Sequence, residues 1–114
     1  MSNCLNEGMM RKKHHITAII FDKRGRPLSI GHNSYSKSIR LQRKHANLVG
    51  MPEKAMTHAE IAAIAKCRSL EKAHTIKVFR YKKSGAPANA MPCKVCMSAI
   101  AEANIRNIEW TTDP

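Results

Sequence analysis

The chain has 114 residues, of which 43% are hydrophobic and only 4% are aromatic. This length suits one globular domain, so we expect residues 1–114 to form a single domain with a small core. Twenty Lys and Arg against eight Asp and Glu give a formal net charge of +12. Such an excess indicates an anionic partner, such as a nucleotide or a nucleic acid, or else a solvated basic surface.

The apolar runs and the four cysteines exclude two other classes of protein. No stretch approaches the ~20 apolar residues of a membrane span, and the N-terminus lacks the apolar core of a secretory signal. The cysteine spacings form no disulfide framework. We therefore expect a protein of the reducing cytoplasm that has no membrane partner.

The first half of the chain predicts a hairpin followed by two helices. Residues 16–21 are an almost continuous β-branched run, and a turn at 22–27 leads to a return strand at 28–33. Residues 38–49 allow a helix. The stretch after Thr57, up to Cys67, is apolar almost all round, which is typical of a helix buried between a sheet and another layer.

The second half predicts a strand, a helix and a strand. Residues 75–81 alternate apolar and basic side chains, residues 82–91 are rich in turn formers, and Pro92 suits the first turn of a helix that runs to about Ala103. Residues 105–111 read as a last strand. Because a helical crossover joins them, the strands at 75–81 and 105–111 should be parallel.

Two short motifs bear the residues that suit catalysis: Thr57-His58-Ala59-Glu60 and Pro92-Cys93-Lys94-Val95-Cys96. One imidazole and two thiolates are ligands that zinc takes, and three protein ligands leave a fourth position open, as in catalytic sites. Glu60 would stand beside that position as a base. The C-x-x-C pair alone would also fit half of a structural zinc site or a redox dithiol. A second C-x-x-C is missing, however, and a redox dithiol gives His58 and Glu60 no role.

H-x-E followed by P-C-x-x-C is the signature of the zinc nucleobase deaminases. From about residue 14 to 111 the chain resembles the cytidine/deoxycytidylate deaminase superfamily, and it looks most like small phage-type deoxycytidylate deaminase-like proteins. The resemblance implies an α/β fold of three layers, with a mixed central sheet of about four to five strands and helices on both faces.

The resemblance also implies roles for particular residues. One zinc ion per chain would be bound by His58, Cys93 and Cys96, and Glu60 would act as the catalytic general base and then acid. Asn33, at the end of the second strand, would contact the sugar of the substrate. Backbone groups at Ala59 and Pro92 would hold the edge of the base.

The resemblance implies that the reaction is hydrolytic deamination of a base. Conversion of cytosine to uracil in a nucleotide such as dCMP, or in a polynucleotide, with release of ammonia, is the first expectation. Deamination of adenosine in tRNA or another nucleic acid is the second. A third alternative is a non-catalytic nucleic-acid-binding module that keeps zinc for stability.

Four basic residues that follow Asn33 are called here the α-stripe: Lys37, Arg40, Arg43 and Lys44. They lie largely on one side of the predicted helix at 38–49, because residues three and four apart are neighbours on a helix. They would contact the phosphates of a nucleotide or single-stranded nucleic acid, or else form a solvated face. A small core with alanine-rich faces further predicts a homo-oligomer, a dimer or larger.

Overall fold

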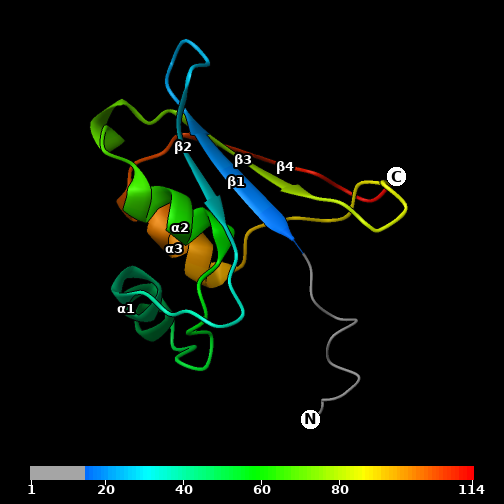
Figure 1. Cartoon of the computed structure of the whole chain (residues 1–114). Helices are drawn as coiled ribbons and strands as arrows, with labels where there is room; N and C mark the ends of the chain where they lie inside the picture. Colours follow the sequence, from blue (N-terminus) through cyan, green and yellow to red (C-terminus); the bar gives the residue numbers. More distant parts are fainter. Residues whose placement is uncertain (1–14) are drawn as a thin grey trace.

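The computed structural model describes residues 15–114 (Figure 1). Its elements, in chain order, are β1 (Ile16–Phe21), β2 (Pro27–His32), α1 (Arg40–Leu48), α2 (Ala59–Lys66), the short 3-10 helix η2 (Leu70–Lys72), β3 (Thr75–Arg80), α3 (Lys94–Glu102) and β4 (Asn107–Trp110). The strands form a four-stranded sheet in the order β2-β1-β3-β4. The expected α/β class with a mixed sheet is confirmed.

The strand directions place the start of β1 beside the ends of β2 and β3. Strand β1 pairs antiparallel with both β2 and β3, and β3 pairs parallel with β4, as the sequence predicted. Residue Thr17 is therefore flanked by His32 on β2 and by Phe79 on β3. This edge of the sheet bears the candidate site, and the β1–β2 turn lies at the other end of β1.

The resemblance implies helices on both faces of the sheet, whereas the helices of the described residues cover one face. Helices α1, α2 and α3 all lie on one side of the sheet (Figure 1). The reason is topological: β2, β3 and β4 are mutually parallel, and the chain crosses from β2 to β3 and from β3 to β4 in the same direction across the sheet. Right-handed crossovers in one direction place their helices on one face.

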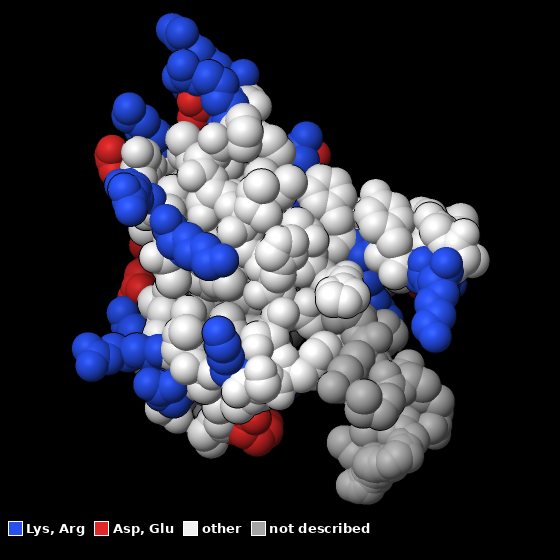
Figure 2. Space-filling model, in the orientation of Figure 1, with Lys and Arg blue, Asp and Glu red and all other residues white. Residues whose placement is uncertain are grey.

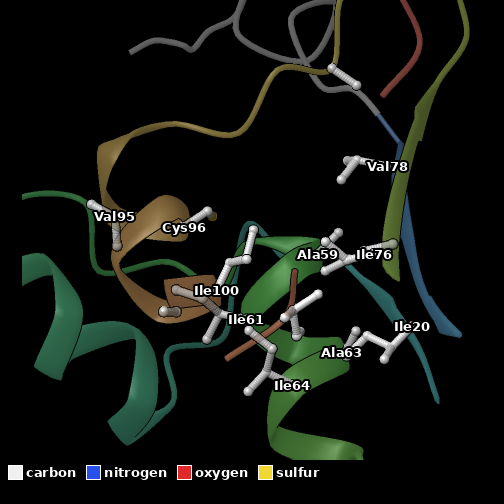
Figure 3. Close-up of a cluster of buried hydrophobic side chains, with 14 of the residues drawn as sticks. Ile20, Ala59, Ile61, Ala63, Ile64, Ile76, Val78, Val95, Cys96 and Ile100 are labelled. Carbon is white, nitrogen blue, oxygen red and sulfur yellow. The ribbon is translucent and has the colours of Figure 1, made fainter. Parts of the chain in front are cut away.

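Helix α2 is the centre of the core. It contacts β1, β2 and β3 on one side and α3 on the other, and its residues Ala59–Ile64 are buried (Figure 3). A Cβ atom added to Gly31 on β2 would overlap the backbone nitrogen of Ala63 and the carbonyl oxygen of Ala59. Alanine on α2 and glycine on β2 thus allow two backbones to approach closely, which fixes the N-terminus of α2 beside the end of β2.

The predicted loop at 82–91 begins as a tight hairpin. Tyr81 forms a β-bridge with Pro87, and the N–H of Lys82 donates to the carbonyl of Ala86 over 2.8 Å. The N–H of Ala90 then donates to the carbonyl of Thr111 after β4. These bonds hold residues 88–91 against the edge of the sheet that bears the candidate site. Among residues 15–114, no helix is long and apolar enough to cross a membrane.

Candidate active site

The three predicted ligands meet where two helices begin. His58 is the N-cap residue of α2, Cys93 is the N-cap residue of α3, and Cys96 lies in the first turn of α3. Helix α3 begins at Lys94 and not at Pro92, because Cys93 has an extended backbone with φ −78° and ψ 176°. The contact of α2 with α3 brings the two N-termini together.

The spacing of the donor atoms fits one zinc ion. The ligand atoms of His58, Cys93 and Cys96 all lie within 4.8 Å of one another. Nδ1 of His58 lies 3.2 Å from Sγ of Cys96 and 3.5 Å from Sγ of Cys93. A tetrahedral zinc ion, with Zn–N of about 2.0 Å and Zn–S of about 2.3 Å, requires an N–S separation of roughly 3.5 Å. The imidazole and the two sulfurs therefore form a donor set of the type and size that zinc takes.

The local electrostatics favour a thiolate at Cys93. A hydrogen bond from Cys96, together with one from His58, lowers the pKa of Cys93 to about 3. The hydrogen bond with Cys93 and burial raise the pKa of Cys96, and the hydrogen bond with Cys93 raises the pKa of His58. Thiolate, the form that binds metal, is thus stabilised on a sulfur at a helix N-terminus.

Glu60 lies beside these ligands with its side chain withdrawn from solvent. The residue is only 5% exposed, and burial raises the pKa of its carboxyl. On a regular helix, positions i and i+2 point about 200° apart. His58 and Glu60 converge because His58 is an N-cap residue with an extended backbone, φ −87° and ψ 155°, and does not follow the helical rotation.

A cavity of about 280 Å³ opens onto His58, Glu60 and Cys93. Asn33 lines it, and its Oδ1 accepts a hydrogen bond of 2.9 Å from the N–H of Ile16. The lining comes from β1, the loop after β2, the segment that leads into α2 with its first turn, the end of β3 and the segment before α3. Its residues are Ile16, Asn33, Ser34, Tyr35, Met56, Thr57, His58, Glu60, Arg80, Asn89, Ala90, Met91 and Cys93.

The other predicted contacts lie outside this lining. Ala59 and Pro92 are buried next to lining residues in the chain. The α-stripe is exposed on and before α1, and none of its four residues lines the cavity. Nζ of Lys44 lies 2.7 Å from Glu102, and Nη1 of Arg43 donates to Ser38 over 3.0 Å. Lys44 and Arg43 of the α-stripe thus contact other side chains of the protein.

Sequence reasoning missed two residues at the site. Gln42 on α1 is fully buried, and its Oε1 accepts a hydrogen bond of 3.0 Å from the N–H of His58. Its Nε2 donates to the carbonyl of Lys54 over 2.8 Å. Arg80, at the end of β3, lines the cavity, and its Nη1 donates to the carbonyl of Asn89 over 3.1 Å. An antiparallel pairing of the first and third strands, which the sequence reading did not assign, would have brought Arg80 to this edge.

Comparisons with known proteins agree with this geometry. A search of individual curated proteins finds no match. At the level of families, the model described as the cytidine and deoxycytidylate deaminase zinc-binding region matches residues 1–112. Because the match spans nearly the whole chain, and His58, Cys93 and Cys96 converge in the structure, the protein belongs to the cytidine and deoxycytidylate deaminase family of zinc-binding proteins.

Proposed function

We propose that this protein converts cytosine to uracil by hydrolysis in a nucleotide or a polynucleotide and releases ammonia. One observation carries the proposal: a buried carboxyl, Glu60, shares a cavity with three zinc-type ligands at two adjoining helix N-termini. Membership of the deaminase family supports the reaction type.

The residues of the cavity have two separate roles, metal binding and proton transfer. Zinc, when bound by His58, Cys93 and Cys96, supplies a water molecule of lowered pKa at its open fourth position. Burial raises the pKa of the Glu60 carboxyl above its usual value, a change that suits a group which first accepts a proton and then returns it. The water oxygen forms a bond to C4 of the base while Glu60 takes one proton and delivers it to N3. Glu60 then takes the remaining proton from the new hydroxyl group on C4 and transfers it to the amino group. The C4–N bond breaks, the C4 carbonyl of uracil forms, and the amino group leaves as ammonia.

The size of the cavity supports cytosine as the base. Its volume of about 280 Å³ lies near the lower limit of ligand pockets, which begin at about 300 Å³. A single-ring base fits such a space more readily than a purine does. Deamination of adenosine in tRNA or another nucleic acid is the second candidate, and a non-catalytic nucleic-acid-binding module is the third.

Arg80 is our candidate for the contact with a substrate phosphate at the cavity. It bears the permanent positive charge of the lining, and the guanidinium group matches the geometry of a phosphate. Its hydrogen bond to the carbonyl of Asn89 fixes the side chain at the wall formed by residues 88–91. The α-stripe remains a candidate for phosphates that lie beyond the cavity.

Two further expectations belong to this proposal. The chain would act in a reducing compartment such as the cytoplasm, since thiolate zinc ligands require reduced cysteines. It would also form a homo-oligomer, for which the large exposed hydrophobic side chains on the surface, such as Ile30 and Leu48, give support. Light scattering at micromolar concentration tests the second expectation, and a monomer would contradict it.

The experiment that tests the function offers the purified protein dCMP, cytidine, adenosine, single-stranded DNA and tRNA. Ammonia is measured together with the mass of the base. Ammonia with uracil from one of the cytosine substrates is the expected result. Inosine as the sole product would establish the second candidate, and binding of nucleic acid without ammonia would establish the third.

A further inference from the structure

A second depression lies at the opposite end of β1 from the candidate active site. It has a volume of about 570 Å³, which exceeds that of the cavity at Glu60. Its wall comes from the β1–β2 turn, from η2 with the two residues that precede β3, and from Arg106 before β4. The function proposed above gives this depression no role.

Positive charge dominates the wall of the depression. We call its five Lys and Arg residues the hairpin-end surface: Lys23, Arg24, Arg26, Lys72 and Arg106. They come from three separate segments and are all exposed. The two acids of the wall are Asp22 and Glu71. In Figure 2, Lys and Arg gather over the projecting β1–β2 hairpin at the top of the view.

Asp22, the acid at the β1–β2 turn, forms hydrogen bonds and an ion pair within the protein. Asp22 is 7% exposed and accepts hydrogen bonds of 2.9 Å from the N–H groups of Arg24 and Arg26. Its second oxygen lies 2.8 Å from Nε of Arg26. Together with the hydrogen bond from the N–H of Gly25, whose φ is +82°, to the carbonyl of Asp22, these contacts fix the turn that presents Lys23 and Arg24.

Four cations of the hairpin-end surface are available to a ligand. Within residues 15–114, the side chains of Lys23, Arg24, Lys72 and Arg106 form no ion pair or hydrogen bond. The α-stripe differs, because Lys44 is paired with Glu102. A cluster of unpaired cations from three segments fits a ligand with several phosphates.

The wall offers little that would recognise a base. It includes no Phe, Tyr or Trp, Nδ1 of its one imidazole, His74, already contacts Thr75 and Asn107, and Ala73 is its one apolar member. A free nucleoside triphosphate would need contacts to its base for specific binding, whereas Lys and Arg alone supply the electrostatic, sequence-independent part of binding to a nucleic-acid backbone. Strand β1 has six residues, so the two ends lie about 17 Å apart. At the duplex spacing of about 3.4 Å per phosphate along one strand, roughly five nucleotides span that separation, and a more extended single strand needs fewer.

We propose that the hairpin-end surface binds the phosphate backbone of a single-stranded nucleic acid whose target base lies in the cavity at Glu60. This proposal rests on the function proposed above only for the identity of the target base. It selects a strand over a free nucleotide as the substrate class.

The test measures binding without turnover. The probe is a labelled single-stranded DNA of about 16 nucleotides that contains no cytosine, titrated at several salt concentrations between about 50 and 200 mM. The variant Lys23→Ala/Arg24→Ala/Arg106→Ala should bind more weakly. The slope of log K against log salt should become shallower by about 2, since each lost phosphate contact removes about 0.7.

A variant with the same loss of charge, Lys37→Ala/Arg40→Ala/Arg43→Ala, is the matched comparison, and it should keep a steeper slope than the first variant. Equal losses in the two variants would overturn the proposal, because the hairpin-end surface would then contribute no more to binding than another group of three cations. Wild-type affinity in the hairpin-end variant would also overturn it. The proposal would also be overturned if free nucleoside triphosphate displaced the labelled strand as well as unlabelled strand does at the same phosphate concentration. Melting temperatures near that of the wild type establish that both variants fold.

A kinetic comparison separates this proposal from the proposed function. The hairpin-end variant should lose kcat/KM on a cytosine-containing strand by about tenfold or more and keep its kcat/KM on dCMP, because that substrate cannot reach 17 Å from the cavity. Equal kcat/KM of variant and wild type on the strand would overturn the proposal. A further outcome is that the wild type binds the strand in a salt-dependent way that the variant loses, and yet releases no ammonia. That result would refute the catalytic function and support binding at the hairpin-end surface.

Discussion

Oε1 of Gln42 accepts a hydrogen bond of 3.0 Å from the backbone N–H of His58, and so connects α1 to the residue at which α2 begins. The N-cap of α2 has no side-chain capping bond, so Gln42 supplies a contact at that helix end from another helix. His45, also on α1 and almost fully buried, contacts Ser98 and Glu102 of α3. Helix α1 therefore contacts both ligand-bearing helices, α2 at its N-cap residue and α3 through side chains along the helix.

We predict that Gln42→Leu lowers both stability and zinc affinity. The change leaves the N–H of His58 and the carbonyl of Lys54 without their partner, and a buried unsatisfied group costs about 1–3 kcal/mol. Loss of a group that orients a metal ligand typically weakens metal binding by about 10–100-fold. Competition with a chelator measures the affinity, and Asn47→Ala on the exposed side of α1 is the control. Reduced stability with unchanged zinc affinity would show that Gln42 does not position His58.

We predict that Cys93→Ser and Cys96→Ser each lose the zinc of the purified protein, about one ion per chain in the wild type, and that both unfold at lower temperature. Zinc binding contributes to folding free energy, because the unfolded chain has no assembled site. Cys67→Ser is the matched control, since Cys67 is a half-buried free cysteine outside the donor set. Metal analysis by mass spectrometry gives the stoichiometry. Equal zinc content in the Cys93 and Cys67 variants would remove Cys93 from the site.

We predict that Gly31→Ala is strongly destabilising, by about 1–3 kcal/mol or more. The added Cβ would meet the backbone of α2 at Ala59 and Ala63, which cannot move without shifting the helix. Gly50→Ala is the control: its φ of +74° makes alanine strained, by about 1 kcal/mol, but the added Cβ has open space. Urea unfolding of both variants compares the two costs. A smaller loss at Gly31 than at Gly50 would contradict the close packing of β2 on α2.

We predict that Arg80→Gln lowers kcat/KM for dCMP by about 10–100-fold while leaving kcat/KM for deoxycytidine nearly unchanged. The estimate corresponds to the loss of a hydrogen bond with a charged partner, about 1.5–3 kcal/mol. Arg80→Lys should retain part of the preference for the nucleotide, because it keeps the charge but not the planar fork. Equal losses on both substrates would mean that Arg80 acts through its bond to Asn89, by shaping the wall of the cavity.

The two motifs were predictable from sequence because their chemistry is local. His58 and Glu60 are two residues apart, Cys93 and Cys96 are three apart, and each pair stands at the beginning of an apolar helix. The structure brings the two pairs together, and the strands appear within two residues of their expected positions. The parallel pairing of β3 and β4 followed from the helical crossover between them.

Other features depend on relations between distant segments. Gln42 reads as a polar residue on an amphipathic helix, and its partner, the N–H of His58, lies 16 positions away in the chain. The side of the sheet that the helices cover depends on strand order, which the sequence reading did not assign. The cations of the hairpin-end surface are spread from Lys23 to Arg106 and form a cluster only after folding.

Whether Glu60 transfers the protons of the reaction is tested by comparing Glu60→Gln with the wild type for zinc content, melting temperature and product formation. Glutamine keeps the shape of the side chain but cannot exchange a proton, and the lost carboxyl is one that burial disfavours in its charged form. We predict that the variant retains its zinc, unfolds at the same or a higher temperature, and deaminates about 10²–10⁴-fold more slowly. Wild-type turnover in a zinc-loaded Glu60→Gln protein would contradict this prediction.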